Sequence, residues 1–174
     1  MGPLFLIAKY LEVPQLVAEV FTGFIILLIL FNYKYRIVPF IEDIERQSFG
    51  TIFYCISLLI LIFIFWDKHD SALIAGVFVM TFGDGLAGLI GKSFKSFKWK
   101  IFNQQKSLLG TSVMLITSFI VVTLVGNNGG FGLDINYFLI AILATILEQF
   151  SVIGIDNFSV PIITSTVFHF LIKT

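Results

Sequence analysis

The sequence predicts an all-α protein, a polytopic bundle of about six transmembrane helices. Its composition is the first reason: 57% of the 174 residues are hydrophobic, 13% are charged, and the mean hydropathy is +0.98. A soluble domain has about 25% charged residues. The second reason is that the apolar residues fall into long runs. Because these runs take up most of the chain, we expect one integral-membrane domain over residues 1–174.

Six apolar runs are separated by polar segments, and each run is expected to form one membrane-crossing helix. Several are at or just below the roughly 17–25 residues that a crossing helix needs. Three runs carry a carboxylate: Glu19 lies in the first, Asp84 in the third and Glu148 in the fifth. The glycine-rich segment 126–134 is typical of a turn. The expected helices cover residues 16–31, 51–66, 72–90, 108–125, 135–153 and 160–172.

Lysine and arginine are distributed unevenly between the two sides of such a bundle. The loops after the first, third and fifth runs hold eight of them, and the other side holds three, Lys9, Lys68 and Lys173. The positive-inside rule then places the basic loops in the cytoplasm and both chain ends on the opposite side. The polar groups suited to chemistry are therefore expected near the cytoplasmic face: Asp84, Lys106, Glu148, Asp156 and Asn157.

Asp84 is the most informative of these residues, because a carboxylate in a membrane run is costly unless it serves a site. Magnesium is commonly bound by one or two carboxylates together with substrate phosphates, so we predict that Asp84 is a metal ligand. A structural hydrogen bond to a neighbouring helix is the alternative. We expect Gly83 and Gly85 to open the backbone for a ligand, and Gly88 and Gly91 to let helices approach closely.

Five lysines follow this run and are interleaved with aromatic residues. Nucleic-acid binding does not suit a segment between two membrane runs, and we exclude nucleic acid as a partner. We expect an interfacial helix instead, with Lys95, Lys98 and Lys100 on lipid head groups and the aromatic rings at the acyl boundary. Lys106 and Ser107 lie where the chain re-enters the membrane, so we predict that they bind phosphate beside a helix N-terminus.

Three stretches share their order and spacing with motifs of a known family. Residues 83–87 (GDGLA) with Lys106-Ser107 resemble its GDxxA…G…KSxEG motif, in which Gly91 and Gly110 take the glycine positions. Residues 45–51 (ERQSFGT) resemble its R-[KR]-S-[YF]-G-T loop. Glu148 followed by DNFSVP at 156–161 resembles its late E…DN[LF][ST]VP motif, although a simple turn is an alternative for Asp156 and Asn157. The family is that of dolichol kinase, phytol kinase and CTP-dependent diacylglycerol kinase, and the chain is most similar to its phytol kinase branch.

The sequence departs from this family at two places. Leu109 stands where the family has an acidic residue after Lys-Ser. The stretch before Leu16 lacks an Arg-Lys…His motif that family members carry in an earlier membrane segment. We therefore expect an N-terminal truncation or a divergent start.

The resemblance implies a lipid-alcohol kinase that transfers the γ-phosphate of CTP, with Mg²⁺, to a phytol-like isoprenoid alcohol at the cytoplasmic membrane face. Two alternatives stay open: phosphatidate cytidylyltransferase-like nucleotidyl transfer, whose late lysine and histidine-glycine motif is absent, and a non-catalytic membrane protein. The implied catalytic residues are Asp84, Lys106, Glu148 and Asp156, with Asp84 as the metal ligand. The implied nucleotide and phosphate contacts are Gly83, Gly85, Lys92, Lys106, Ser107, Gly110 and Asn157.

Overall fold

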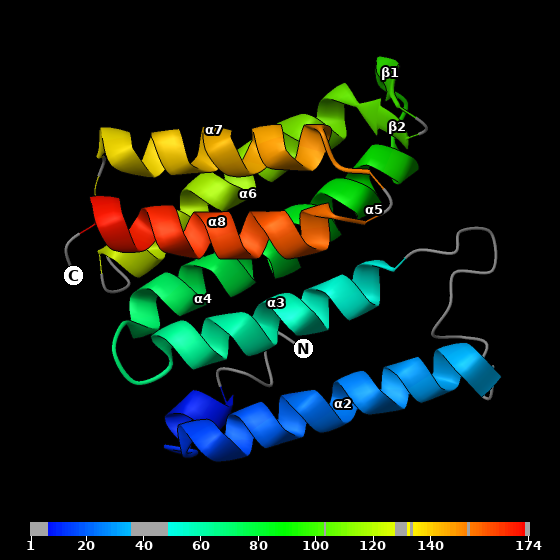
Figure 1. The fold of residues 1–174 in the computed structure, drawn as a ribbon. Helices are drawn as coiled ribbons and strands as arrows, with labels where there is room; N and C mark the ends of the chain where they lie inside the picture. The colour runs from blue at the N-terminus through cyan, green and yellow to red at the C-terminus, as the bar shows by residue number, and fades with distance from the viewer. Residues whose placement is uncertain are drawn as a thin grey trace.

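The computed structural model is a bundle of helices with one short hairpin (Figure 1). It describes residues 7–35, 49–102, 104–127, 132, 134–152 and 154–172. Most of the 45–51 motif, the loop residues around it and most of the segment 126–134 lie outside these residues. The helices are α2 (Gln15–Tyr35), α3 (Gly50–Phe65), α4 (Asp70–Phe78), the π-helix η2 (Val79–Asp84), α5 (Gly85–Ser93), α6 (Leu108–Gly126), α7 (Ile135–Gln149) and α8 (Asp156–Leu171). The strands are β1 (Lys98–Ile101) and β2 (Gln104–Ser107).

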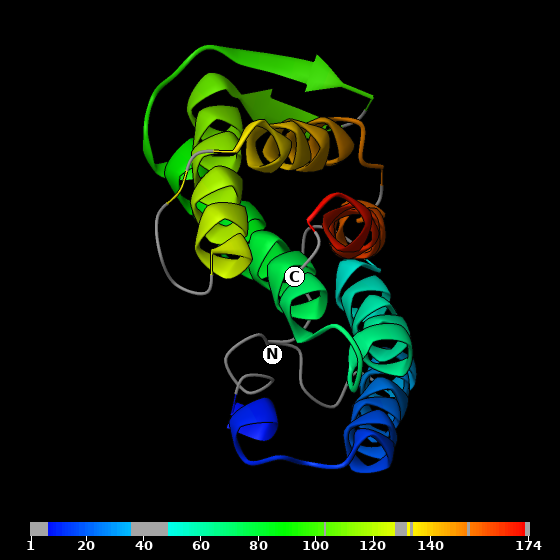
Figure 2. The same ribbon diagram turned by 90° about the vertical axis from the view of Figure 1, so that its left-hand side faces the viewer.

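Each of the expected apolar runs contains a helix, and successive helices alternate in direction (Figure 1). Helices α4, η2 and α5 follow one another without a break and count as one run, Asp70–Ser93. Seen along the bundle, this run lies between α6 on one side and α3 and α8 on the other, while α2 packs on α3 (Figure 2). The alternation places the ends of α5, α7 and α2 at the same end of the bundle as the starts of α3, α6 and α8.

Helix α8 begins at Asp156, four residues before the expected start of the last run, and α7 ends at Gln149. Pro161 lies inside α8, and a proline cannot donate to the carbonyl four residues earlier, which belongs to Asn157. The single O–H of Ser57 on α3 is shared between this carbonyl, at 3.1 Å, and that of Tyr54, at 2.8 Å. A neighbouring helix thus supplies a donor where the proline removes one.

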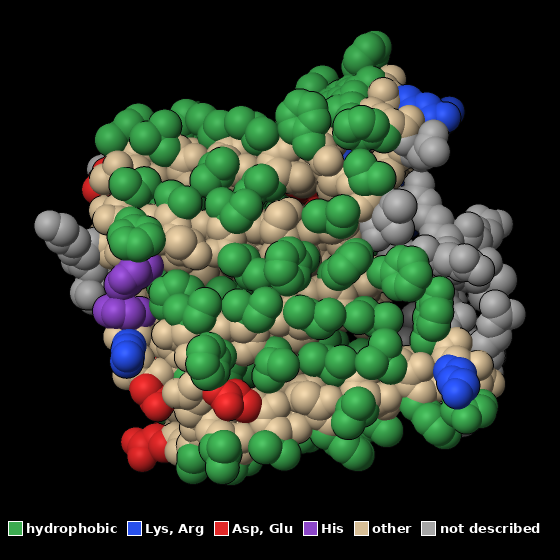
Figure 3. Space-filling model, viewed as in Figure 1, with side chains coloured by type: hydrophobic (Ala, Val, Ile, Leu, Met, Phe, Trp, Pro, Cys, Tyr) green, Lys and Arg blue, Asp and Glu red, His purple; other side chains and the backbone are tan. Residues whose placement is uncertain are grey.

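The surface of the bundle is that of a membrane protein. Among the described residues, α2, the run Asp70–Ser93 and α6 are long and apolar enough to cross a membrane, and α3 and α7 are apolar but shorter. Large apolar side chains face outward, and Phe63 and Phe170 are each 72% exposed. On the face shown in Figure 3, hydrophobic side chains cover the middle, and charged side chains gather near the two ends of the helices. The predicted helical membrane bundle is therefore confirmed, while six crossings and the orientation stay predictions.

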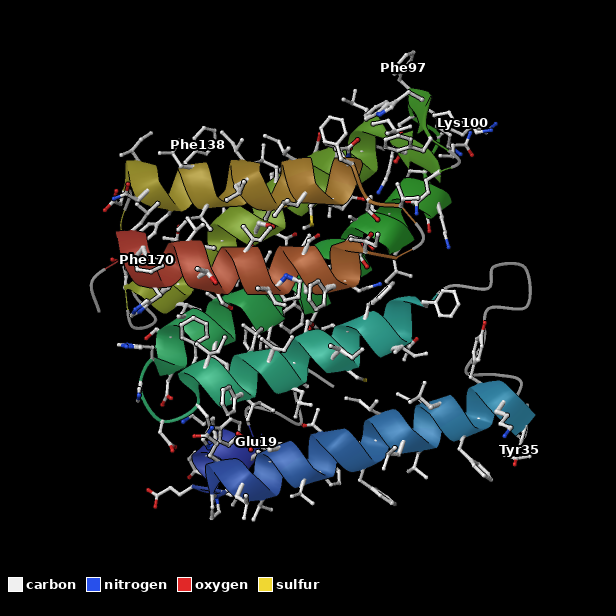
Figure 4. The ribbon with its side chains drawn as sticks, viewed as in Figure 1. Glu19, Tyr35, Phe97, Lys100, Phe138 and Phe170 are labelled. Atoms are coloured by element: carbon white, nitrogen blue, oxygen red, sulfur yellow. The ribbon has the colours of Figure 1, made fainter. Side chains whose placement is uncertain are left out.

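The lysine-rich segment corrects one expectation, because it forms an antiparallel β-hairpin and not an interfacial helix. Its sequence KWKI alternates in polarity with the period of a strand, so Trp99 and Ile101 face inward and Lys98 and Lys100 are exposed. Phe102 takes a positive φ of 51° in the turn. Lys100 and the exposed Phe97 extend from the hairpin end of the molecule (Figure 4).

Candidate active site

Charged side chains from four separate segments meet at the hairpin end of the bundle. Asp84 ends the π-helix, Lys106 lies on β2, Glu148 is in the last turn of α7, and Asp156 opens α8. In Figure 1 this is the right-hand end, where α7 stops and α8 starts beside α5 and the hairpin. The alternation of helix direction, which follows from short connections between crossing segments, brings these residues together from positions far apart in the sequence.

The helix that carries Asp84 is irregular where it approaches this end. Val79–Asp84 is a π-helix between two α-helical segments, and such segments occur frequently at functional sites. Thr81 in its centre donates to the carbonyl of Val77 at 2.7 Å, and its hydroxyl lies 3.0 Å from the Tyr54 hydroxyl of α3. These bonds fix the widened turn whose last residue is Asp84.

The Asp84 carboxylate is half-buried and lies within electrostatic range of four charged groups. Two are the carboxylates of Asp156 and Glu148, and two are the ammonium groups of Lys106 and Lys92. No side chain among the described residues forms a hydrogen bond or an ion pair with Asp84, so the structural hydrogen bond given as the alternative is not seen there. A carboxylate beside two others, with no direct partner, is a group that a cation would stabilise.

Lys106 and Glu148 form a nearly buried ion pair. Both side chains are 10% exposed, the ammonium group contacts Oε1 of Glu148, and it also donates to the backbone carbonyl of Glu148 at 2.7 Å. The hairpin sets the direction of the lysine, because Lys106 stands opposite Trp99 and paired residues share a face of the sheet. The lysine predicted to bind phosphate is thus paired with a carboxylate.

The second carboxylate oxygen of Glu148 has a partner that sequence reasoning missed. Gln149 Nε2 donates to Glu148 Oε2 at 2.9 Å and to the Thr111 hydroxyl at 2.7 Å. Thr111 in turn donates to the carbonyl of Ser107 at 3.0 Å. The only sequence signals were the position of Gln149 beside Glu148 and that of Thr111 one helical turn after Ser107, and neither identifies a contact between two helices.

Ser107 and Gly110 have local partners at the start of α6. The Ser107 hydroxyl caps the helix by accepting the Gly110 N–H at 3.1 Å. A Cβ added to Gly110 would lie 3.1 Å from the carbonyl oxygen of Ala87, and one added to Gly91 would lie 2.6 Å from the Ser107 hydroxyl oxygen. Gly91 and Gly110 therefore let α5 and α6 approach closely, as predicted for Gly91. Phosphate binding by Ser107 and Gly110 stays a prediction.

Gly83, Gly85 and Gly88 differ in how much space surrounds each of them. Gly83 is buried, and an added Cβ would lie 2.8 Å from the sulfur of Met114 on α6, so Gly83 lets the two helices pack closely. Ligand contact by Gly83 stays a prediction. An added Cβ at Gly85 or Gly88 would meet nothing within 4 Å. Gly88 therefore is not a close-packing position, and Gly85 keeps the open surroundings that a ligand contact needs.

Asp156, Asn157 and Lys92 complete the set. Asp156 is 8% exposed, lies in the first turn of α8, and accepts the Asn157 N–H through Oδ1 at 3.1 Å. An acidic group is favoured there by the helix dipole, so the turn considered for this pair is a helix start. Lys92 is exposed in the last turn of α5. The carbonyl of Asn157 is occupied by Ser57, and nucleotide binding by Asn157 stays a prediction.

The sequence of the chain is similar to those of several known proteins. The chain is 34% identical over 166 residues to a protein named phytol kinase from Synechocystis sp., an alignment that covers 92% of the chain and 71% of that relative. A probable chloroplastic phytol kinase of Triticum aestivum is 32% identical over 144 residues, with 71% of the chain and 44% of the relative covered. Phytol kinase 1 of Arabidopsis thaliana is 29% identical over 131 residues, with 69% and 42% covered.

The chain thus spans less than half of these two plant relatives and about seven tenths of the Synechocystis protein. No protein-family model matches it, and no solved structure matches it. The alignment to the Synechocystis protein extends over nearly the whole chain. The chain belongs to the phytol kinase family.

Proposed function

We propose that the protein transfers the γ-phosphoryl group of CTP to the hydroxyl of a phytol-like isoprenoid alcohol, at the cytoplasmic face of a membrane. As a member of the phytol kinase family, it is an enzyme of the lipid-alcohol kinase type. The observation that carries the proposal is the gathering of two further carboxylates and two lysines around Asp84 at one end of an apolar bundle. Such an end can meet a lipid hydroxyl and a water-borne nucleotide at once.

The residues present fit a magnesium ion that arrives with the nucleotide. Asp84 offers a carboxylate without a direct partner in the described residues, and Asp156 offers a second one nearby. Within those residues no group of three or more His, Cys, Asp or Glu side chains could hold a metal alone. This suits Mg²⁺, which uses one or two carboxylates together with phosphates and water. When bound, Mg²⁺ would neutralise phosphate charge, and Asp84 would hold it.

The remaining groups have separate tasks in the transfer. The alcohol oxygen attacks the γ-phosphorus, the bond from that phosphorus to the bridging oxygen breaks, and CDP leaves with the bonding electron pair. Lys106 and Lys92 counter the negative charge on the phosphates. The alcohol proton passes to a carboxylate, and we favour Asp156, because both oxygens of Glu148 already accept bonds from Lys106 and Gln149. Positioning and electrostatics supply most of the rate in such reactions.

The apolar surface of the bundle suits a substrate that lies in the membrane. A long isoprenoid chain would lie in the hydrocarbon beside the apolar helices, and its hydroxyl would reach the end of the bundle that carries Asp84. The same end carries the lysine-rich hairpin, whose exposed lysines suit anionic lipid head groups. This arrangement supports an alcohol that enters from the membrane and a nucleotide that enters from water.

A panel of nucleotides and lipid alcohols tests the proposal. Purified protein in lipid nanodiscs is incubated with CTP, ATP, GTP or UTP and with phytol, geranylgeraniol, a dolichol or diacylglycerol, and products are identified by mass. We expect phytyl phosphate and CDP in equal amounts from CTP and phytol, and none after Mg²⁺ is chelated. Release of pyrophosphate with a cytidylylated lipid would indicate nucleotidyl transfer, and the absence of any lipid product would contradict the kinase assignment.

A further inference from the structure

We propose that Gln149 and Thr111 are positioning residues that hold Glu148 in place while Lys106 exchanges its partner for the nucleotide phosphates. The inference rests on the proposed kinase function and adds two residues to the candidate site. It starts from a closed ring of polar contacts that links β2, α6 and α7.

The ring is described by its bonds in order. Lys106 pairs with Glu148 Oε1, Gln149 donates to Glu148 Oε2 at 2.9 Å and to Thr111 at 2.7 Å, and Thr111 donates to the Ser107 carbonyl at 3.0 Å. Ser107 follows Lys106 in the chain, which closes the ring. An amide group has two N–H donors, so Gln149 can make both of its bonds at once.

The ring gives Lys106 a way to leave Glu148. A buried carboxylate that loses its only partner is left unpaired, and this is strongly unfavourable. Glu148 is 8% exposed, so a lysine that turned toward phosphate would leave its charge in nearly dry surroundings. The Gln149 amide stays bonded to Oε2 in that event and is itself held by Thr111. Glu148 therefore keeps one donor and its orientation while Lys106 binds the nucleotide.

Four variants separate this role from simple packing. Gln149→Leu keeps the approximate size of the side chain but removes both donors. Thr111→Val keeps the shape of the side chain and removes the hydroxyl, whereas Thr111→Ser keeps the hydroxyl and removes a methyl group. Thr166→Val is the matched control, because Thr166 on α8 bonds to the carbonyl of Ile162 one turn earlier, at 2.8 Å, away from the ring.

Steady-state kinetics with CTP and phytol, together with thermal unfolding of each purified variant, give the readout. We expect Gln149→Leu to lower kcat by about 10- to 100-fold, the size typical for outer residues that orient a functional group. The KM for CTP should rise as well, because Glu148 then lacks the donor that lets Lys106 turn from it to the phosphates. Thr111→Val should lower kcat by about three- to tenfold. Thr111→Ser and Thr166→Val should stay within about twofold of the unaltered protein.

Several outcomes would overturn the inference. One is a Gln149→Leu variant with unchanged kcat, and another is a Thr111→Ser variant as slow as Thr111→Val, because the hydroxyl would then be irrelevant. A loss confined to kcat, with an unchanged KM for CTP, would also overturn it, because the release of Lys106 to the phosphates would then not depend on Gln149. Failure of the proposed function is recognised separately, since the unaltered protein would then make no phosphorylated lipid, and the inference would fall with it.

Discussion

Replacing Asp84 by Asn is expected to lower kcat by at least about a hundredfold without loss of folded protein. The carboxamide has the shape of the carboxylate but lacks the charge that would hold Mg²⁺ against the phosphates. Stability should stay the same or rise, because the change removes one of three neighbouring carboxylates and therefore some like-charge repulsion. The measurement is turnover with CTP and phytol, compared with the thermal unfolding midpoint of the same preparation.

Asp67→Asn is the matched control for this variant. Asp67 is an exposed carboxylate in the turn between α3 and α4, at the opposite end of the bundle from Asp84. The same chemical change there should leave turnover within about twofold. Folded Asp84→Asn protein with undiminished turnover would remove Asp84 from the reaction.

Lys106→Met is expected to reduce both stability and turnover. The substitution leaves Glu148 buried with its charge uncompensated on one oxygen, and breaking a buried pair from one side costs about 3–5 kcal/mol. The phosphates of CTP should also lose the positive charge that Lys106 supplies, so that kcat/KM for CTP falls by at least about a hundredfold. Stability is followed by thermal or detergent-induced unfolding, and activity by the same lipid kinase assay.

The double variant Lys106→Met/Glu148→Gln separates the two losses. With both charges removed, neither member of the pair is left buried and uncompensated, and the free energy of unfolding should return to within about 1 kcal/mol of the unaltered protein. Turnover should stay low, because neither the cation nor the carboxylate is restored. Recovered turnover in the double variant would show that the pair is only structural, and a Lys106→Met variant with normal stability would contradict the buried pair.

The helices could be predicted because a membrane imposes a simple pattern on the sequence. A run of apolar residues long enough to cross hydrocarbon must satisfy its backbone internally, and each such run is helical here. The hairpin was missed because its strands span only four residues each, and lysines mixed with aromatic rings also fit an interfacial helix. The two-residue alternation in KWKI was the signal that distinguishes the two.

The candidate site was predictable as a set of residues but not as a set of contacts. Asp84 and Glu148 stand out as carboxylates inside apolar runs, and alternating loops predict that they share one end. The bond between Lys106 and Glu148 joins residues 42 positions apart, and no local pattern specifies such a partner. Gln149 and Thr111 were missed for the same reason, because an amide and a hydroxyl near helix ends are common and acquire meaning only from their contacts.

Gly83 shows a further limit of sequence reasoning. A glycine beside a membrane carboxylate suggests room for a ligand, yet its missing side chain makes room for Met114 of α6. Gly85 and Gly88, which look similar in sequence, face open space. Only the rotation of the helix within the bundle decides which glycine serves packing, and the π-helical turn before Gly85 alters that rotation.

The central claim is that nucleotide phosphates bind at the end of the bundle that carries Asp84, and cysteine protection tests it most directly. Gly88→Cys places a thiol in open space one turn after Asp84, Asp67→Cys places one at the opposite end, and the native Cys55 is fully buried. We predict that saturating Mg²⁺-CTP slows maleimide labelling of the Gly88→Cys variant at least about tenfold and leaves that of the Asp67→Cys variant unchanged. Equal labelling of the Gly88→Cys variant with and without nucleotide, under conditions that support turnover, would contradict the account.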